Sequence, residues 1–230
     1  MTKWTREKVA ATIDHAVLKP SLTDQDIVQG CQLGKKYQVA SVCVRPSDVA
    51  AASRELAGSG VKVSMVVGFP HGANRSEVKA LEARLAIQDG ARELDMVMNI
   101  GKFLSGQYDY VRDDIKAVVN EAKPHGVLVK VIFESCFLTL EQVAKATELS
   151  IAAGADFVKT STGFADGSAT PEAVATMIKT AAGRIKVKPS GGIRDYAKAV
   201  AFLEQGADRL GVGATAAVLD GAPANVNDKY

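Results

Sequence analysis

The amino-acid sequence predicts a single α/β domain with the architecture of a (β/α)8 barrel. Short apolar runs alternate with helix-forming stretches about eight times, in units of about 28 residues, a length typical of one βα unit. Strands that alternate with helices form a parallel sheet. The chain has 230 residues, close to the roughly 250 residues of a TIM barrel built from eight such units.

Six glycines mark the boundaries between these units. Each follows a helical stretch and directly precedes an apolar run; they are Gly60, Gly90, Gly126, Gly154, Gly183 and Gly206. Glycine suits the left-handed backbone that ends a helix, and the apolar runs suit strands that are buried on both faces. Two earlier strands are predicted at Ala10–Ala16 and Ala40–Arg45, and a short extra N-terminal helix at Thr5–Val9.

Several helices carry start signals. Capping side chains occur at Thr23, at Asn74 with Glu77, at Thr139 with Gln142 and at Thr170 before Pro171, and another helix is expected to begin near Pro46. After Asn74, Val78, Leu81 and Leu85 recur at helical spacing with charged residues between them. This pattern predicts an amphipathic helix that packs its apolar stripe against the sheet.

The competing architecture is an open, doubly wound sheet. That fold does not need eight near-equal units, and no Gly-x-Gly-x-x-Gly motif follows the first clear strand. We predict one barrel domain over residues 1–219, without a linker. The polar segment 220–230 is predicted to be a mobile C-terminal tail.

Composition and charge argue against several classes of protein. Lys and Arg number 28 and Asp and Glu number 26, so the net charge of +2 indicates no nucleic-acid or membrane partner. The first 19 residues carry charges where a signal peptide is apolar, and no apolar run could span a bilayer. Three scattered cysteines and three histidines, without a Cys-x-x-Cys pair, argue against a disulfide framework and a structural zinc site. We expect a cytoplasmic protein with reduced thiols.

Four charged residues interrupt the apolar runs: Asp95, Lys130, Lys159 and Lys188. Buried lysine and aspartate almost always have partners, so one interpretation is a structural ion-pair network. The other is catalysis, because the active sites of such barrels lie at the C-terminal ends of the strands.

The pairing of Lys159 with Lys188 favours catalysis. They lie on consecutive predicted strands, which are about 4.8 Å apart in a sheet. A lysine attacks a carbonyl only when neutral, and at a pKa near 10.4 only about 0.04% is neutral at pH 7. A dry pocket and a second cation both lower that pKa. The pattern predicts Schiff-base chemistry with one lysine as nucleophile, the other lowering its pKa, and an acid from a third strand.

Glycine-rich turns follow the last three predicted strands. In these barrels the loops after strands seven and eight form the usual phosphate site, where backbone N–H groups meet the anion. The sequence predicts such a site from Gly163, Gly191, Gly192, Gly211 and Gly213, with Arg194 as an added charge. The alternative is that the glycines only form tight turns and that Arg194 caps its own helix.

Seven segments of the sequence match the motifs of one known enzyme family. They are IDHAVLKP (13–20), SVCVRP (41–46), VVGFPHG (66–72), ELDMVMNIG (93–101), VKVIFE (129–134), FVKTSTGF (157–164) and VKPSGGIR (187–194). Together they resemble the deoxyribose-phosphate aldolase family of class I aldolases, from about Thr12 to Val218. The resemblance implies reversible cleavage of 2-deoxy-D-ribose 5-phosphate to D-glyceraldehyde 3-phosphate and acetaldehyde. It implies no metal or other cofactor, because the protonated imine acts as the electron sink.

The resemblance also implies roles for the charged residues. Lys159 matches the lysine that forms the Schiff base with acetaldehyde, and Lys188 matches the lysine that lowers its pKa and assists proton transfer. Asp95 matches an aspartate that relays protons through water. Many members end in a tyrosine that reaches the site, which makes Tyr230 a candidate.

The sequence departs from the family at two places. A common Gly-Thr-Ser-Ser run is Gly211-Val212-Gly213-Ala214 here, which removes hydroxyls that could contact phosphate unless Thr215 compensates. The departure predicts weaker discrimination between phosphorylated and free deoxyribose, so that non-phosphorylated aldehydes are also accepted. A usual Asp-His-Thr is Asp14-His15-Ala16. Asp14 is expected either to bind a substrate hydroxyl or to cap the end of the first strand.

Other residues are weaker candidates. Cys43 and Cys136 are expected to be buried core residues with at most a minor chemical role, and His71 to shape a loop. Lys130 is predicted to support the site, with Glu134 as its ion-pair partner.

Two other functions remain open at this point. One is a Schiff-base aldolase for another sugar phosphate, and the other is a sugar-phosphate sensor without catalysis. A sensor does not need the lysine pair with a nearby acid. The default oligomer is a symmetric homodimer, and the sequence carries no interface signal for it.

Overall fold

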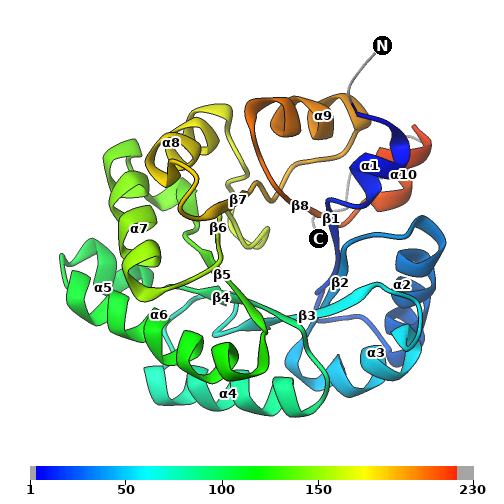
Figure 1. Ribbon diagram of the computed structural model, residues 1–230, viewed down its shortest axis with the longest axis horizontal. Helices are drawn as coiled ribbons and strands as arrows, with labels where there is room; N and C mark the ends of the chain where they lie inside the picture. The colour runs from blue at the N-terminus through cyan, green and yellow to red at the C-terminus, as the bar shows by residue number, and fades with distance from the viewer. Residues whose placement is uncertain (1–3, 222–230) are drawn as a thin grey trace.

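Eight parallel strands form a ring enclosed by helices in the computed structural model, which describes residues 4–221 (Figure 1). The strands are β1 (Ile13–Val17), β2 (Ser41–Val44), β3 (Lys62–Val67), β4 (Glu93–Val97), β5 (Leu128–Ile132), β6 (Phe157–Lys159), β7 (Lys186–Lys188) and β8 (Leu210–Val212). Neighbours pair in the order β7-β6-β5-β4-β3-β2-β1-β8. A parallel bridge between Ser190 and Gly211 joins the segment after β7 to β8. The predicted (β/α)8 barrel is confirmed.

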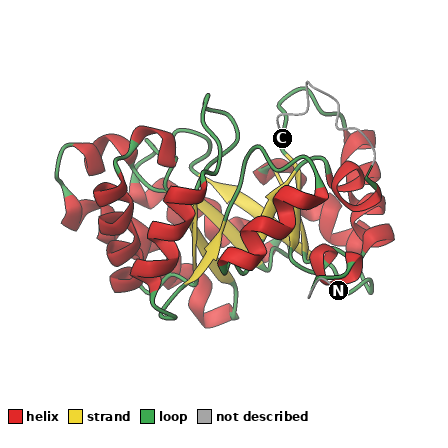
Figure 2. Cartoon of the chain, turned by 90° about the horizontal axis from the view of Figure 1, so that it is seen from above, coloured by secondary structure: helices red, strands yellow, loops and turns green. Residues whose placement is uncertain are grey.

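The helices lie outside the strands, and loops cover the rims of the barrel (Figure 2). They are α1 (Arg6–Ala10), α2 (Asp24–Tyr37), α3 (Val49–Leu56), α4 (Ser76–Gln88), α5 (Ile100–Leu104), α6 (Tyr108–Ala122), α7 (Leu140–Ala153), α8 (Pro171–Ala181), α9 (Tyr196–Gln205) and α10 (Thr215–Asp220), with 3₁₀ turns η1 (Pro46–Asp48), η2 (Lys123–His125) and η3 (Ser135–Phe137). The extra N-terminal helix is therefore present as α1. No helix within residues 4–221 is long and apolar enough to cross a membrane.

Local sequence signals mark several helix ends correctly. Thr23 and Thr139 form reciprocal capping boxes with Asp26 and Gln142, and Thr170 caps α8 ahead of its first-turn proline. All six boundary glycines adopt positive φ, as expected. The capping box predicted at Asn74 was wrong, because α4 begins at Ser76 after Arg75, which makes no side-chain cap.

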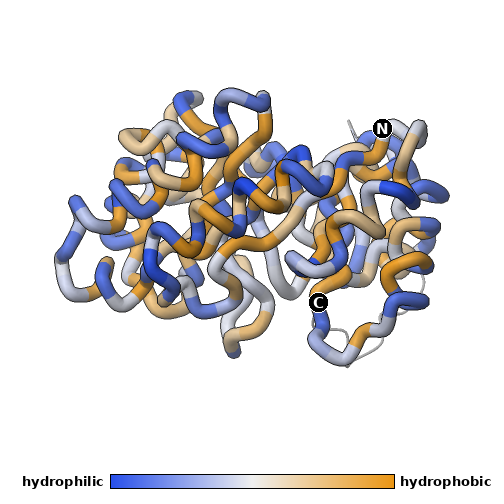
Figure 3. The backbone as a smooth tube through the Cα atoms, turned by 90° about the horizontal axis from the view of Figure 1, so that it is seen from below, coloured by the Kyte–Doolittle hydropathy of each residue, from blue (hydrophilic) through white to orange (hydrophobic). Residues whose placement is uncertain are grey.

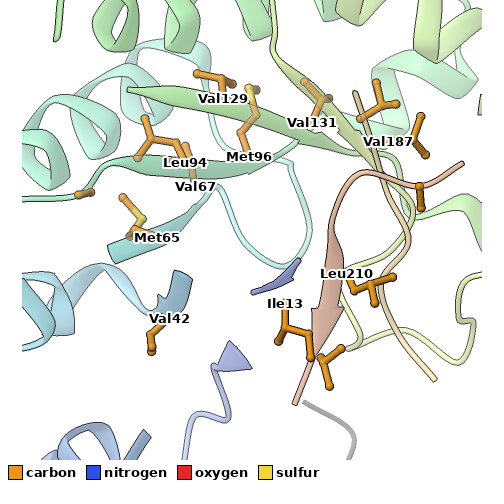
Figure 4. Close-up of a cluster of buried hydrophobic side chains, with 14 of the residues drawn as sticks. Ile13, Val42, Met65, Val67, Leu94, Met96, Val129, Val131, Val187 and Leu210 are labelled. Atoms are coloured by element: carbon orange, nitrogen blue, oxygen red, sulfur yellow. The ribbon is translucent and has the colours of Figure 1, made fainter. Parts of the chain in front are cut away.

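The apolar core lies between the strands and the helices. Ile13, Leu94, Met96, Val129 and their neighbours in Figure 4 belong to one buried cluster. Charged residues alternate with them along the same strands and turn to the inside of the barrel, where they contact one another. Along the outer helices, hydrophobic and hydrophilic stretches alternate, as expected for amphipathic helices (Figure 3). The barrel interior is therefore available for polar chemistry.

Helix α4 is rotated relative to the prediction. Val78, Leu81 and Leu85 are 43%, 44% and 50% exposed instead of facing the sheet. The buried face of α4 carries Lys79, two alanines and Ile87. The Lys79 ammonium donates to Asp114 of α6 at 2.6 Å and to the carbonyl oxygen of Val97 at 2.9 Å. Small residues and one paired lysine let α4 lie close to its neighbours, and hydrophobic periodicity alone does not detect this.

We expect Asp114→Ala to lower the free energy of unfolding by about 3 kcal/mol, because it leaves the fully buried Lys79 ammonium without its carboxylate. Urea denaturation measures the loss. The matched control is Asp113→Ala on the same helix, where an exposed ion pair with Arg112 contributes at most about 1 kcal/mol. Equal effects of the two substitutions would contradict the importance of the buried pair.

Candidate active site

The strands place the three predicted catalytic residues inside the barrel. Lys159 and Lys188 are the last residues of β6 and β7 and pair directly in register, and Asp95 lies in β4. All three are buried, with at most 2% of each residue exposed. The expected proximity of the two lysines is therefore present.

Asp95 lies at the centre of this cluster. Its Oδ2 accepts hydrogen bonds from the Nζ atoms of Lys159 at 2.9 Å and Lys188 at 2.7 Å, and its Oδ1 accepts one from Lys130 at 2.7 Å. One carboxylate thus holds three ammonium groups from β5, β6 and β7 at fixed positions.

A second layer of charges supports the first. Lys130 also contacts Glu93 at 2.6 Å and Asp14 at 3.3 Å, and Lys188 contacts Asp14 at 2.5 Å. The guanidinium of Arg209 donates to Asp14 at 2.6 Å and to Glu93 at 3.1 Å. Sequence reasoning missed Glu93 and Arg209. The signal for Glu93 was present, since it precedes Asp95 by two residues and therefore shares its face of β4.

These contacts shift the pKa values in opposite directions. Burial opposes the charge of Asp95, but the attraction of Lys130, Lys159 and Lys188 outweighs it and holds the pKa of Asp95 well below its usual value. Burial lowers the pKa of Lys159, and the charge of Lys188 lowers it further, against the attraction of Asp95. The lowered pKa therefore favours the neutral form of Lys159, which is the form that a nucleophile needs.

The number of charges in the network supports the same assignment. Burial also opposes the charge of Lys130, but Asp14, Asp95 and Glu93 outweigh it and raise the pKa of Lys130. Three carboxylates face four basic groups, which are Lys130, Lys159, Lys188 and Arg209. Loss of one proton leaves the network balanced, and the lowered pKa of Lys159 identifies it as the group that loses this proton.

An open cavity of about 320 Å³ adjoins the ends of β6, β7 and β8. All six residues predicted to bind phosphate line it, and they are Gly163, Gly191, Gly192, Arg194, Gly211 and Gly213. Gly191 and Gly192 adopt φ of 87° and 72°, and a Cβ on Gly191 would lie 3.3 Å from the Cα of Ser168. Glycine at these positions lets two loops approach closely enough to shape the cavity. Sequence reasoning missed Lys198 and Ser168, which also line it.

Asp14 and Cys43 do not line this cavity. Asp14 is 1% exposed, and its oxygens contact Lys188, Arg209 and the hydroxyl of Ser41. A contact between Asp14 and a substrate hydroxyl stays a prediction. Cys43 is buried beside Leu18 and Val66, and burial raises the pKa of its thiol. That shift suits a core residue and not a nucleophile.

Two expectations about neighbouring residues were wrong. Lys130 does not pair with Glu134, because a left-handed turn after β5, with φ of 54° at Glu134, directs that carboxylate to the N–H and hydroxyl of Thr162. Cys136 is exposed instead of buried, because it lies in the turn η3 and not in a strand. Tyr230 and most of the predicted tail lie outside the described residues, and α10 ends at Asp220.

The barrel interior shows no donor set for a metal. Among the described residues, no three His, Cys, Asp or Glu side chains are grouped so that they could hold an ion. His71 is exposed in the loop after β3. His15 is buried against Thr215, with 2.9 Å between its Nδ1 and the threonine hydroxyl, and burial lowers its pKa to about 4.

Known proteins share this fold and sequence. Deoxyribose-phosphate aldolases of a Geobacillus species and of Clostridium tetani are 49% and 51% identical, over 95% and 88% of this chain and 98% and 93% of theirs. The solved deoxyribose phosphate aldolase of Aeropyrum pernix, a tetramer, is 32% identical, with a TM-score of 0.88 over 94% of this chain and 92% of that one. The family model described as DeoC/LacD family aldolase matches residues 8–217. The chain therefore belongs to the DeoC/LacD aldolase family.

Proposed function

We propose that this protein is a deoxyribose-phosphate aldolase. It reversibly cleaves 2-deoxy-D-ribose 5-phosphate to D-glyceraldehyde 3-phosphate and acetaldehyde through a Schiff base on Lys159. The observation that carries the proposal is the shared contact of Lys159 and Lys188 with one oxygen of Asp95, beside a glycine-lined cavity. The names of the curated relatives support the choice of substrate.

The first half of the reaction builds and uses the imine. Neutral Lys159 adds its Nζ to C1 of the open-chain sugar to give a carbinolamine. The carbinolamine hydroxyl takes up a proton from solvent and leaves as water, which gives a protonated imine. The C3 hydroxyl then loses its proton and the C2–C3 bond breaks. The electron pair of that bond moves toward the iminium nitrogen, which leaves an enamine on Lys159 and releases D-glyceraldehyde 3-phosphate.

The second half restores the enzyme. C2 of the enamine takes up a proton, and water hydrolyses the resulting imine. This hydrolysis releases acetaldehyde and regenerates Lys159 as a free amine. Lys188 is the second cation whose charge lowers the pKa of Lys159, and the Nζ atoms of both lysines donate to the same oxygen of Asp95. The low pKa of Asp95 keeps the carboxylate charged, which suits the positioning of both amines. A proton relay through Asp95 stays a prediction.

Borohydride reduction in the presence of acetaldehyde tests the proposal. We expect one ethyl group to be fixed on Lys159, found by peptide mass mapping, because a neutral amine in the barrel traps the two-carbon donor. Exposed lysines such as Lys179 serve as internal controls for non-specific reduction. An adduct found only on exposed lysines would contradict the proposal, and turnover without an acetaldehyde adduct would favour an aldolase with another donor.

Oligomeric state and location also belong to the proposal. We infer a homo-oligomer, with a homodimer as the expected form, which light scattering at micromolar concentration tests. Cytoplasmic localisation stays an expectation from the sequence.

A further inference from the structure

We propose that Lys198 supplies the positive charge on which recognition of the substrate phosphate depends. The proposal rests on the proposed function, since it concerns the same cavity at the ends of β6, β7 and β8. Lys198 lies in α9, outside the motifs that indicated the phosphate site in the sequence.

The fold directs Lys198 toward the cavity. Its backbone N–H donates to the carboxylate of Asp195 at 2.7 Å, which fixes the first turn of α9. The Nζ atom reaches back over the glycine turn after β7 and lies 3.4 Å from the position that a Cβ would occupy on Gly192. The hydroxyl of Ser168 lies 3.0 Å from the same position. The ammonium therefore lies at the wall of the cavity, beside a hydroxyl that can share a ligand.

The charge of Lys198 is available to a ligand. Within residues 4–221, the ion pairs of the structure include neither Lys198 nor Arg194, whereas the lysines of the barrel interior are paired with Asp14, Glu93 and Asp95. The exposed Asp166 is the carboxylate that also lines the cavity. Among the residues that line the cavity, two cations face one exposed anion, which leaves a net positive charge; the Asp195 carboxylate that caps α9 is not part of the lining.

The segment at the end of β8 contributes no free hydroxyl to this cavity. Val212, Gly213 and Ala214 have none, and Thr215 is 1% exposed with its hydroxyl bonded to His15. Thr215 therefore does not compensate for the missing hydroxyls in this structure. Recognition of phosphate then depends on charge, on backbone groups and on the Ser168 hydroxyl, and an ammonium is an effective point charge for a phosphate dianion.

The test compares 2-deoxyribose 5-phosphate with 2-deoxyribose as substrates of the full-length chain. We expect Lys198→Met to lower the ratio of the two kcat/KM values by about tenfold or more, through a higher KM for the ester, because a charge-assisted contact is lost. Lys198→Glu should lower it further. The matched control is Lys179→Met, which removes an exposed lysine from the last turn of α8. This substitution should leave the ratio of the two kcat/KM values unchanged.

Titration with inorganic phosphate separates this proposal from the proposed function. If the wild-type chain does not turn over the ester, the aldolase assignment fails, but calorimetry still shows whether Lys198→Met weakens phosphate binding by about tenfold. Weaker phosphate binding in the variant supports the role of Lys198 in either case. An unchanged affinity for phosphate, an equal loss of kcat/KM on both sugars, or a Lys198→Glu variant no worse than Lys198→Met would overturn it.

Discussion

Replacement of Lys159 by methionine is expected to lower kcat/KM for cleavage of 2-deoxyribose 5-phosphate by at least about 10⁴-fold, because it removes the nucleophile itself. The same substitution should leave the free energy of unfolding unchanged or raise it by about 1 kcal/mol. Lys159 carries the surplus charge of the buried network, and Asp95 keeps Lys130 and Lys188 as partners without it. Initial rates and urea denaturation measure the two effects.

The pKa of Lys159 predicts how the effect of Lys159→Met on the free energy of unfolding changes with pH. Burial lowers the pKa of Lys159 in the folded state below that of an unfolded lysine, so the folded protein binds the proton more weakly. This costs stability at neutral pH, and the cost disappears as the pH rises through the unfolded pKa of about 10.4. Any gain from Lys159→Met should therefore be larger at neutral pH than above about pH 10.4. A large loss of stability at pH 7 would contradict the surplus-charge account.

The control for the nucleophile is Lys188→Met. This variant keeps Lys159 but removes the second cation that lowers its pKa. We expect residual trapping of acetaldehyde on Lys159 and a kcat/KM profile shifted to higher pH. Complete loss of the adduct in a folded Lys188→Met variant would show that the two lysines do not have separate roles.

The strand pattern and local helix signals were sufficient to predict the barrel. Each boundary glycine and most capping residues act within a few positions of themselves, so their effect can be predicted without the fold. Helix α4 shows the limit of this reasoning. Its orientation is decided by the buried pair between Lys79 and Asp114, which lie 35 positions apart on different helices. Periodicity detects an apolar stripe, but it does not detect which face of the helix a distant carboxylate will bury.

The candidate site could be predicted only in part, for a related reason. Lys159 and Lys188 were detectable because charge is rare in an apolar strand, and the glycines because they end strands. Arg209 precedes its strand and Lys198 lies in a helix, where basic residues are common, so nothing in the local sequence distinguishes them. Their importance comes from the neighbours that barrel closure gives them, which are Asp14 and Glu93 in one case and the turn at Gly192 in the other.

The second large effect is expected for Asp95→Asn. This substitution keeps the shape of the side chain but removes the negative charge that three ammonium groups share. We expect the free energy of unfolding at pH 7 to fall by about 3–5 kcal/mol, as for other buried charges that lose their partner. Trapping of acetaldehyde should also slow, because Lys159 and Lys188 lose the contact that holds them together. The matched control is Asp89→Asn, an exposed aspartate after α4, with an effect within about 0.5 kcal/mol.

If the free energy of unfolding depends on pH in opposite ways in the wild type and in Asp95→Asn, the lost charge of Asp95 is the cause of the lower stability. The pKa of Asp95 is lowered on folding, so its contribution in the wild type is present above the unfolded pKa of about 3.9 and is lost as the pH falls through the folded value. The Asn variant lacks this acid-dependent loss. It should instead regain stability on the alkaline side, because Lys159, whose ion pair was with Asp95, releases its proton as the pH rises toward about 10.4. If Asp95→Asn is as stable as the wild type at pH 7, the lysines are not held in place by this carboxylate, and the geometry proposed for Schiff-base formation must have another origin.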